Sequence, residues 1–270
     1  MKKLSFLLIF GVCVIIFVAC QKSFNPKIIS AELIEVVANE HSRNNEMSQW
    51  ILPYKLAIDE IMGVEIGISA QKMEAGRPES LLGRFVTDVM NDYAKNQGHK
   101  FDFTITNVGG LRGSLPQGVL TIGDIYSVFP FDNELVILTL SGKKVEQLCQ
   151  EIAKQGGQVT DGIRMVVFEE RAEHISISGK KLDTSKNYQV LTTDYLSFGN
   201  DKLYALADYS EILPLKAPLR DVIIDYIKNE FKNGRKINAK TKGEVFFGNP
   251  LLIMVDSYDE DWGYDKKINH

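Results

Sequence analysis

The stretch Glu134-Leu-Val-Ile-Leu-Thr-Leu140, followed at once by Ser141-Gly142, decides the fold. Such a nearly continuous apolar run is typical of a strand that is buried on both faces. The chain then changes to a helical spacing of apolar residues, at Val145, Leu148, Cys149 and Ile152. A buried strand that leads directly into an amphipathic helix predicts a sheet with helices packed on it.

On either side of this stretch, strands and helices follow one another in an irregular order. The sequence predicts a helix over 79–95, which Glu79 or Ser80 can cap, and a last helix from Pro218 onward. We expect further strands at 101–106, 163–168, 174–178 and 188–193. Because strands and helices do not alternate strictly, this order favours an α+β fold: a mixed sheet with packed helices.

The composition is that of a packed globular chain. Hydrophobic residues make up 44% and charged residues 24% of the 270 residues, which excludes general disorder. The net charge of −4 disfavours a nucleic acid polymer as the main partner, since such proteins usually carry a basic excess. Three cysteines are too few for a disulfide framework or a cysteine-rich zinc site, and we expect Cys149 to be a small core residue.

The first twenty residues have the pattern of an export signal. Lys2 and Lys3 precede an uncharged apolar run from Leu4 to Ala19, which ends at Cys20 before a polar segment. This arrangement resembles a bacterial lipobox, which implies cleavage before Cys20 and lipidation of that cysteine. We therefore expect an extracytoplasmic protein that is lipid-anchored to the bacterial membrane, at the outer membrane or in the periplasm. The alternative is an uncleaved N-terminal anchor helix.

The string Asn107-Val-Gly-Gly-Leu-Arg112 follows directly on a predicted strand. Gly109 and Gly110 allow the backbone to pass close to a ligand, and Arg112 offers a permanently charged, forked donor for a phosphate or carboxylate. Taken alone, the same pattern also suits a tight turn with a surface arginine.

Two further loops carry aromatic residues. Phe131 lies in Phe129-Pro-Phe-Asp-Asn133, before the buried strand, and Tyr195 lies in Tyr195-Leu-Ser-Phe-Gly-Asn-Asp201, after another strand. Two rings that hold a flat base between them would contribute about 1–3 kcal/mol per base. Taken singly, each ring also suits an anchor that packs its own loop.

Together these segments resemble the C-terminal, substrate-binding domain of the 5′-nucleotidase/UDP-sugar hydrolase/2′,3′-cyclic phosphodiesterase family. The resemblance runs from about Gly63 to Phe247 and rests on six motifs in order: Arg77-Pro-Glu-Ser-Leu-Leu-Gly83, Asn107-x-Gly-Gly-x-Arg112, Thr121-x-Gly-Asp124, Phe129-Pro-Phe-x-Asn133, Leu140-Ser-Gly-Lys143 and Tyr195-x3-Gly-x-Asp201. It divides the chain into a signal peptide (1–19), a tether and N-terminal edge segment (20–62), the domain (63–247) and a C-terminal extension (248–270).

The resemblance implies a nucleotide or nucleoside site. On its phosphate and ribose side, Arg112 and Arg77 match arginines that meet the phosphate or ribose, and Asp201 matches the acid that binds ribose hydroxyls. Asn107 matches the asparagine before the glycine pair Gly109–Gly110.

On the base side, the resemblance implies that Phe131 and Tyr195 sandwich the base. Asn133 matches the asparagine at the base edge, and Gly157 matches a glycine near the base. Two positions depart from the family pattern: Leu81 stands before the Leu82-Gly83 pair where asparagine is usual, and Asn200 stands where glycine is usual. Asn200 is expected to be strained if that position needs a positive φ.

Family enzymes hydrolyse phosphate esters with two metals, which are bound by a large preceding domain with Asp-x-His, Gly-Asn-His and paired histidine motifs. None of these motifs occurs in this sequence, and its four histidines lie far apart: His41, His99, His174 and His270. We interpret all four as structural or surface residues. We therefore expect no catalytic residue, metal or cofactor in this chain, and divalent metals only in a partner phosphatase domain.

The leading hypothesis is an extracytoplasmic nucleotide-binding module that works with a separately encoded metallophosphatase subunit in nucleotide hydrolysis. Two alternatives stay open: a solitary protein that captures nucleotides or nucleosides, and a lipoprotein scaffold that binds no ligand.

Overall fold

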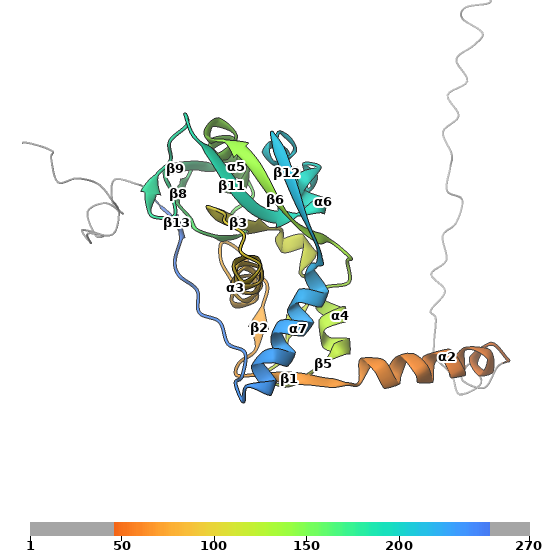
Figure 1. Ribbon diagram of the computed structural model, residues 1–270. Coiled ribbons are helices and arrows are strands. Elements are labelled where there is room, and N and C mark those ends of the chain that lie inside the picture. The colour runs from red at the N-terminus through yellow and green to blue at the C-terminus, as the bar shows by residue number, and fades with distance from the viewer. Residues whose placement is uncertain (1–45, 249–270) are drawn as a thin grey trace, which may run out of the picture. The chain divides into compact units, whose positions relative to one another are not determined.

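The computed structural model describes residues 46–248 (Figure 1). Its first element, helix α2 (Glu46–Met62), spans the boundary between two compact units, which falls after Leu52. The elements from β1 to β13 all lie in the unit that begins at Pro53. The signal peptide, Cys20 and the extension beyond Gly248 lie outside the described residues. Within 46–248, no helix has the length and apolar character needed to cross a bilayer.

Helix α2 falls within residues 20–62, which the sequence analysis expected to be a tether and N-terminal edge segment. Its apolar residues, from Met47 to Ile61, remain exposed instead of forming one buried stripe. Pro53 also lies inside the helix, where proline usually disfavours helical structure. Because of these two features, the spacing of apolar residues in this segment does not predict an amphipathic helix.

A five-stranded mixed sheet forms the centre of the domain. Its strand order is β12 (Glu211–Pro218), β6 (Glu134–Ser141), β11 (Asn187–Thr193), β3 (Phe103–Thr106) and β7 (Val159–Asp161). The pair β11–β3 is parallel, whereas β12–β6, β6–β11 and β3–β7 are antiparallel. The predicted strand over 134–140 is thus confirmed as a central strand.

The apolar run of β6 is buried because the sheet separates two hydrophobic clusters. Leu135 and Ile137 belong to one cluster, and Val136, Leu138 and Leu140 to the other. Successive side chains of a strand point to opposite faces, so only a strand covered on both sides needs an unbroken apolar sequence.

Helices and smaller sheets cover both faces of the central sheet (Figure 1). One cluster contains residues of α3 (Leu81–Asn96), α4 (Ile122–Val128) and α7 (Leu219–Lys232), with the pairs β1 (Glu65–Ser69)–β5 (Gly118–Thr121) and β2 (Met73–Glu74)–β4 (Ser114–Leu115). The other contains residues of α5 (Gly142–Lys154) and of a second sheet, β10 (Lys180–Lys181)–β9 (Arg171–Ile177)–β8 (Ile163–Phe168)–β13 (Val245–Phe247). This arrangement confirms the α+β class.

The boundaries of the predicted elements are close to the observed ones. Helix α3 begins at Leu81, because the Ser80 hydroxyl accepts a hydrogen bond from Gly83 N at 3.1 Å. Cys149 is fully buried, as expected for a core residue. The sequence analysis missed α4, whose first turn is closed by a capping box between Thr121 and Asp124.

Candidate functional site

Four loops meet at one end of the strands of the five-stranded sheet, which is called the sheet edge from here on. Because β3 and β11 are parallel, the loops that follow them, 107–112 and 194–201, leave from the same edge. Strands β6 and β7 run antiparallel to these neighbours, so the loops that precede them, 129–133 and 155–158, arrive there too. The topology therefore brings together three of the motifs that the sequence analysis singled out, at 107–112, 129–133 and 195–201, with the loop that contains Gly157.

Asp201 links two of these loops. Its Oδ2 accepts a hydrogen bond from Asn107 Nδ2, and its Oδ1 accepts one from the Tyr195 hydroxyl at 3.0 Å. The bond to Asp201 raises the pKa of Tyr195, with smaller contributions from desolvation and from the Asp201 charge, while the positive charge of Arg112 lowers it. Tyr195 therefore holds its proton and orients the Asp201 carboxylate.

The glycine pair makes room for this arrangement. A Cβ on Gly109 would lie 3.0 Å from Asp201 Oδ2, and one on Gly110 would lie 2.9 Å from Asn107 Oδ1. The absence of a side chain at Gly109 and Gly110 thus leaves room for the Asp201 and Asn107 side chains. The sequence analysis had expected the glycines to leave room for a ligand instead.

Arg112 and Phe131 lie against each other in the candidate site. The Arg112 guanidinium carbon is 5.3 Å from the centre of the Phe131 ring, within the range of a cation–π contact. Phe131 is 42% exposed and Tyr195 is 38% exposed, so both rings present a free surface. Asn133, two residues after Phe131, is half-buried, and its carbonyl accepts a hydrogen bond from Leu219 N at 2.9 Å.

Arg77 and Gly157 complete the group of predicted residues. Arg77 Nη1 donates a hydrogen bond to the Gly157 carbonyl. Desolvation lowers the pKa of Arg77, and the negative charge of Asp201 opposes that change. Gly157 has φ 105°, and a Cβ there would lie 2.7 Å from Pro78 Cα, so only glycine fits.

Three residues that the sequence analysis missed hold the loops in place. Gln158 is 1% exposed and accepts from Val108 N at 2.9 Å. Asp194 Oδ1 accepts from Glu134 N at 3.1 Å and from Tyr195 N at 2.7 Å, which ties the two aromatic loops together. Arg220, from α7, pairs with Asp132 and donates to a main-chain carbonyl at the start of the Phe131 loop. The sequence gives little indication of these roles, because each of the three polar residues binds a group that is distant along the chain.

The structure places both departures from the family pattern. Leu81 is the first residue of α3 and packs, half-buried, against the hydrophobic core. The positive φ angles in the Asp201 loop belong to Gly199 (75°), Asp201 (53°) and Lys202 (59°), so the expected strain does not fall on Asn200. Asn200 Nδ2 instead donates to the Tyr195 carbonyl at 2.8 Å, which closes the loop.

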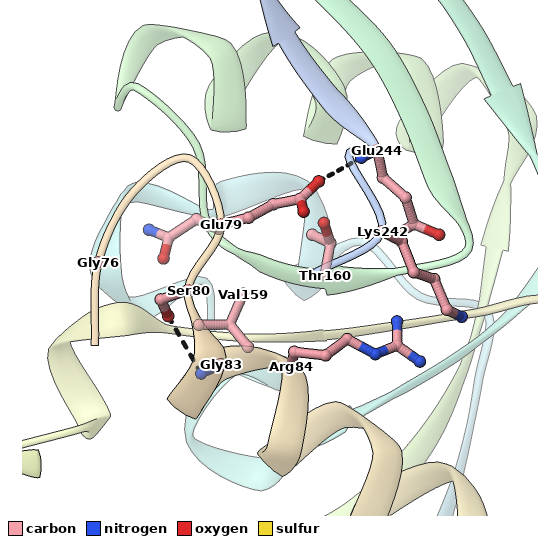
Figure 2. Close-up of a pocket in the computed structure, with 10 residues that line it drawn as sticks. Gly76, Glu79, Ser80, Gly83, Arg84, Val159, Thr160, Lys242 and Glu244 are labelled. Carbon is pink, nitrogen blue, oxygen red and sulfur yellow. Dashed lines mark hydrogen bonds between the residues drawn. The ribbon is translucent and has the colours of Figure 1, made fainter. Parts of the chain in front are cut away.

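A small hollow lies beside the first turn of α3 (Figure 2). Its lining comprises Gly76, Glu79, Ser80, Gly83, Arg84, Gln158, Val159, Thr160, Lys242 and Glu244. Thr160 Oγ1 is buried there without a hydrogen-bond partner. The sequence analysis named Glu79, Ser80 and Gly83 only as parts of a helix entry and did not predict a hollow there.

Within residues 46–248, no group of three histidine, cysteine, aspartate or glutamate side chains is arranged to hold a metal ion. Two of the four histidines are described: His99 is half-buried after α3, and His174 lies within β9. His41 and His270 lie outside the described residues.

The sequence matches a family model described as "5′-nucleotidase, C-terminal domain" over residues 63–208. A trifunctional nucleotide phosphoesterase of Bacillus subtilis is 23% identical over 250 residues, which cover 84% of this chain and 17% of that protein. A 5′-nucleotidase of Vibrio cholerae is 24% identical over 200 residues, covering 70% of this chain and 35% of that protein. This chain thus spans about a third or less of the length of these curated relatives.

Solved structures show the same fold. A 5′-nucleotidase precursor from Thermus thermophilus superposes with a TM-score of 0.64 at 22% identity, covering 74% of this chain and 43% of that one. A NAD nucleotidase from Haemophilus influenzae superposes with a TM-score of 0.57 at 22% identity, covering 75% and 41%.

Proposed function

Because this chain belongs to the family of 5′-nucleotidase C-terminal domains, we propose that it binds a nucleotide or nucleoside at the sheet edge. The observation that carries the proposal is the convergence of four loops around Asp201. Asn107 and Tyr195 bind the two oxygens of that carboxylate, and Arg112 lies against the exposed ring of Phe131.

Each part of the site suits one part of such a ligand. The exposed rings of Phe131 and Tyr195 offer flat surfaces for a base. Arg112 and Arg77 supply guanidinium groups, which bind phosphate with paired hydrogen bonds. Asp201 supplies an acceptor for ribose hydroxyls. Because stacking accepts any base, the proposal specifies the ligand class and leaves the base open.

Calorimetry with AMP and adenosine tests this proposal. We expect Phe131→Ala and Tyr195→Ala each to weaken binding by about 1–3 kcal/mol, or about five- to hundredfold. Phe231→Ala is the matched control, since Phe231 is 46% exposed near the far end of α7, about 18 Å along the helix from Leu219. Wild-type protein that binds neither these compounds nor UDP-glucose and other nucleotides with a different base would leave only the scaffold hypothesis.

Hydrolysis, in this proposal, takes place on a separate metallophosphatase subunit. Two-metal hydrolysis needs several converging histidine and carboxylate ligands, and the sequence holds only four scattered histidines. Mixing the chain with AMP, a divalent metal and a candidate phosphatase subunit should restore phosphate release, and a chelator should abolish it. Binding without release from any candidate would favour the alternative, a solitary capture protein.

The proposed location is outside the cytoplasm, with the chain lipid-anchored through Cys20 at the outer membrane or in the periplasm. The support is the order of Lys2-Lys3, the apolar run and Cys20. Mass spectrometry of the mature N-terminus should find an acylated Cys20, and Cys20→Ser should release the protein from the membrane fraction. An intact N-terminus that begins at Met1 would instead support the uncleaved anchor helix.

A further inference from the structure

The C-terminal strap, defined here as residues 237–247, runs from the β1 pair to the second sheet beside α3 (Figure 1). At its start, Ile237 N donates to Ile68 O at 2.9 Å, and its carbonyl accepts from Ala70 N at 2.9 Å. At its end, β13 pairs in parallel with β8. The strap lies beyond the matched residues 63–208 and carries none of the predicted ligand-binding residues.

Between these two ends, the strap binds the side chain of Glu79 with three consecutive backbone N–H groups. Gly243 N donates to Oε2 at 3.0 Å, Val245 N donates to Oε1 at 3.0 Å, and Glu244 N also donates to Oε1 (Figure 2). Hydrogen bonds to an ionised carboxylate are roughly twice as strong as neutral ones. Glu79 is therefore fixed by the strap, whereas Ser80 caps the helix.

A second set of contacts holds the strap in register. Lys242 Nζ forms an ion pair with Asp161 Oδ1 at 2.7 Å, and Arg84 from α3 pairs with the same carboxylate. Gly162 N donates to both oxygens of Glu244, at 3.3 and 3.2 Å. The three N–H groups that face Glu79 thus belong to a segment that is itself anchored.

The other end of the same short loop carries Arg77. Its Nη1 donates to the Gly157 carbonyl, and Pro78 packs directly on Gly157. Three successive residues are thus held: Arg77 and Pro78 by the Gly157 loop, and Glu79 by the strap. Because only Pro78 separates Arg77 from Glu79, a displacement of Glu79 also moves the Cα atom of Arg77 and the side chain attached to it.

We infer that the C-terminal strap positions Arg77 through Glu79, so that the guanidinium is set for the phosphate of the bound nucleotide. This inference rests on the proposed function, because it takes the phosphate as the group that Arg77 meets. Holding the loop before binding reduces the conformational freedom that Arg77 would otherwise lose when the ligand arrives. Glu79 is a positioning residue, since it acts through Arg77.

The test compares AMP with adenosine, which lacks the phosphate, in Glu79→Gln. The glutamine keeps one acceptor oxygen but turns an NH₂ group toward the strap donors. We expect the Kd for AMP to rise about five- to tenfold, while the Kd for adenosine stays at its wild-type value. The matched control is Gln71→Ala, which removes a different contact to the strap, from Gln71 Nε2 to the Ala239 carbonyl at 2.6 Å. It should change neither Kd.

Equal losses for AMP and adenosine in Glu79→Gln, or no loss for AMP, would overturn the inference while the proposed function stood. Wild-type protein that binds neither these two compounds nor the matching nucleotide and nucleoside pairs of the other bases would instead overturn the proposed function, on which the inference rests. Hydrogen exchange supplies a readout without ligand: in both Glu79→Gln and Glu79→Ala, the amides of 243–245 and of the 76–80 loop should exchange faster together. Faster exchange in the strap alone would show that the strap does not hold the loop.

Discussion

Glu244 should make the stability of the domain fall as the pH rises through neutrality. Burial raises the pKa of its carboxyl from 4.5 to about 7, and the nearby Asp161 charge adds to this increase. The Gly162 N–H and the charges of Lys242 and Arg84 oppose it. A carboxyl whose pKa is higher in the folded state binds its proton more tightly there. Its contribution to stability is therefore full below about pH 4.5 and is lost as the pH rises through about 7.

The size of the effect follows from the pKa difference. The shift corresponds to about 3 kcal/mol, which we reduce to about 1–2 kcal/mol because Glu244 is partly exposed to screening solvent. Between about pH 5 and 8, wild-type protein should lose this much more unfolding free energy than Glu244→Gln, whose side chain stays neutral. In this range Asp161 stays ionised, because its pKa is lowered despite burial, by Lys242 and Arg84.

Urea denaturation followed by far-ultraviolet circular dichroism at several pH values measures this difference. The control is Glu211→Gln, which removes an exposed carboxylate from β12 and should keep the wild-type pH dependence. Identical pH dependence in wild type and Glu244→Gln, or a wild-type stability that rises relative to the variant toward pH 8, would refute the reasoning.

Three other experiments, two substitutions and one labelling reaction, test the packing of the domain. Gly157→Ala should cost about 1–3 kcal/mol of unfolding free energy, because its Cβ would press on Pro78 at a positive φ; an unchanged urea midpoint would contradict this. Cys149 should resist iodoacetamide until the protein unfolds, since burial raises the pKa of its thiol to about 12, and peptide mapping would reveal labelling in the native state. Arg220→Ala should lower the unfolding free energy by about 1–3 kcal/mol, beyond the loss in Asp132→Ala, because Arg220 is nearly buried; equal losses would show that only their ion pair matters.

Much of the fold was predictable because its strongest signals are local. The run over 134–140 is apolar at successive positions since both faces of β6 are covered, and α3 shows its buried face at three- and four-residue intervals. Strand β12 was missed for an equally physical reason. It is an edge strand that contains Pro214, and proline within an apolar segment argues against a central strand.

The candidate site was predictable as a set of residues but not as a set of contacts. The spacing of Asn107 and Arg112 along one loop is visible in the sequence, whereas the bond between Asn107 and Asp201 joins positions 94 residues apart. Likewise, nothing near Glu79 in the sequence indicates a partner at Gly243. Such contacts depend on strand order and register, which apolar periodicity does not specify.

In the proposed arrangement, the residues that hold the site extend beyond the family-model match, which ends at residue 208. A truncation after residue 236 would keep all ten predicted ligand residues, yet it would remove the three N–H donors to Glu79 and the Lys242–Asp161 ion pair. The Glu79 carboxylate would then be hydrated by water instead of bound by fixed N–H donors. The Arg77 loop would keep only its contacts with Gly157. In this proposal the strap contributes to the site through its hydrogen bonds to Glu79, although it contains none of the motifs.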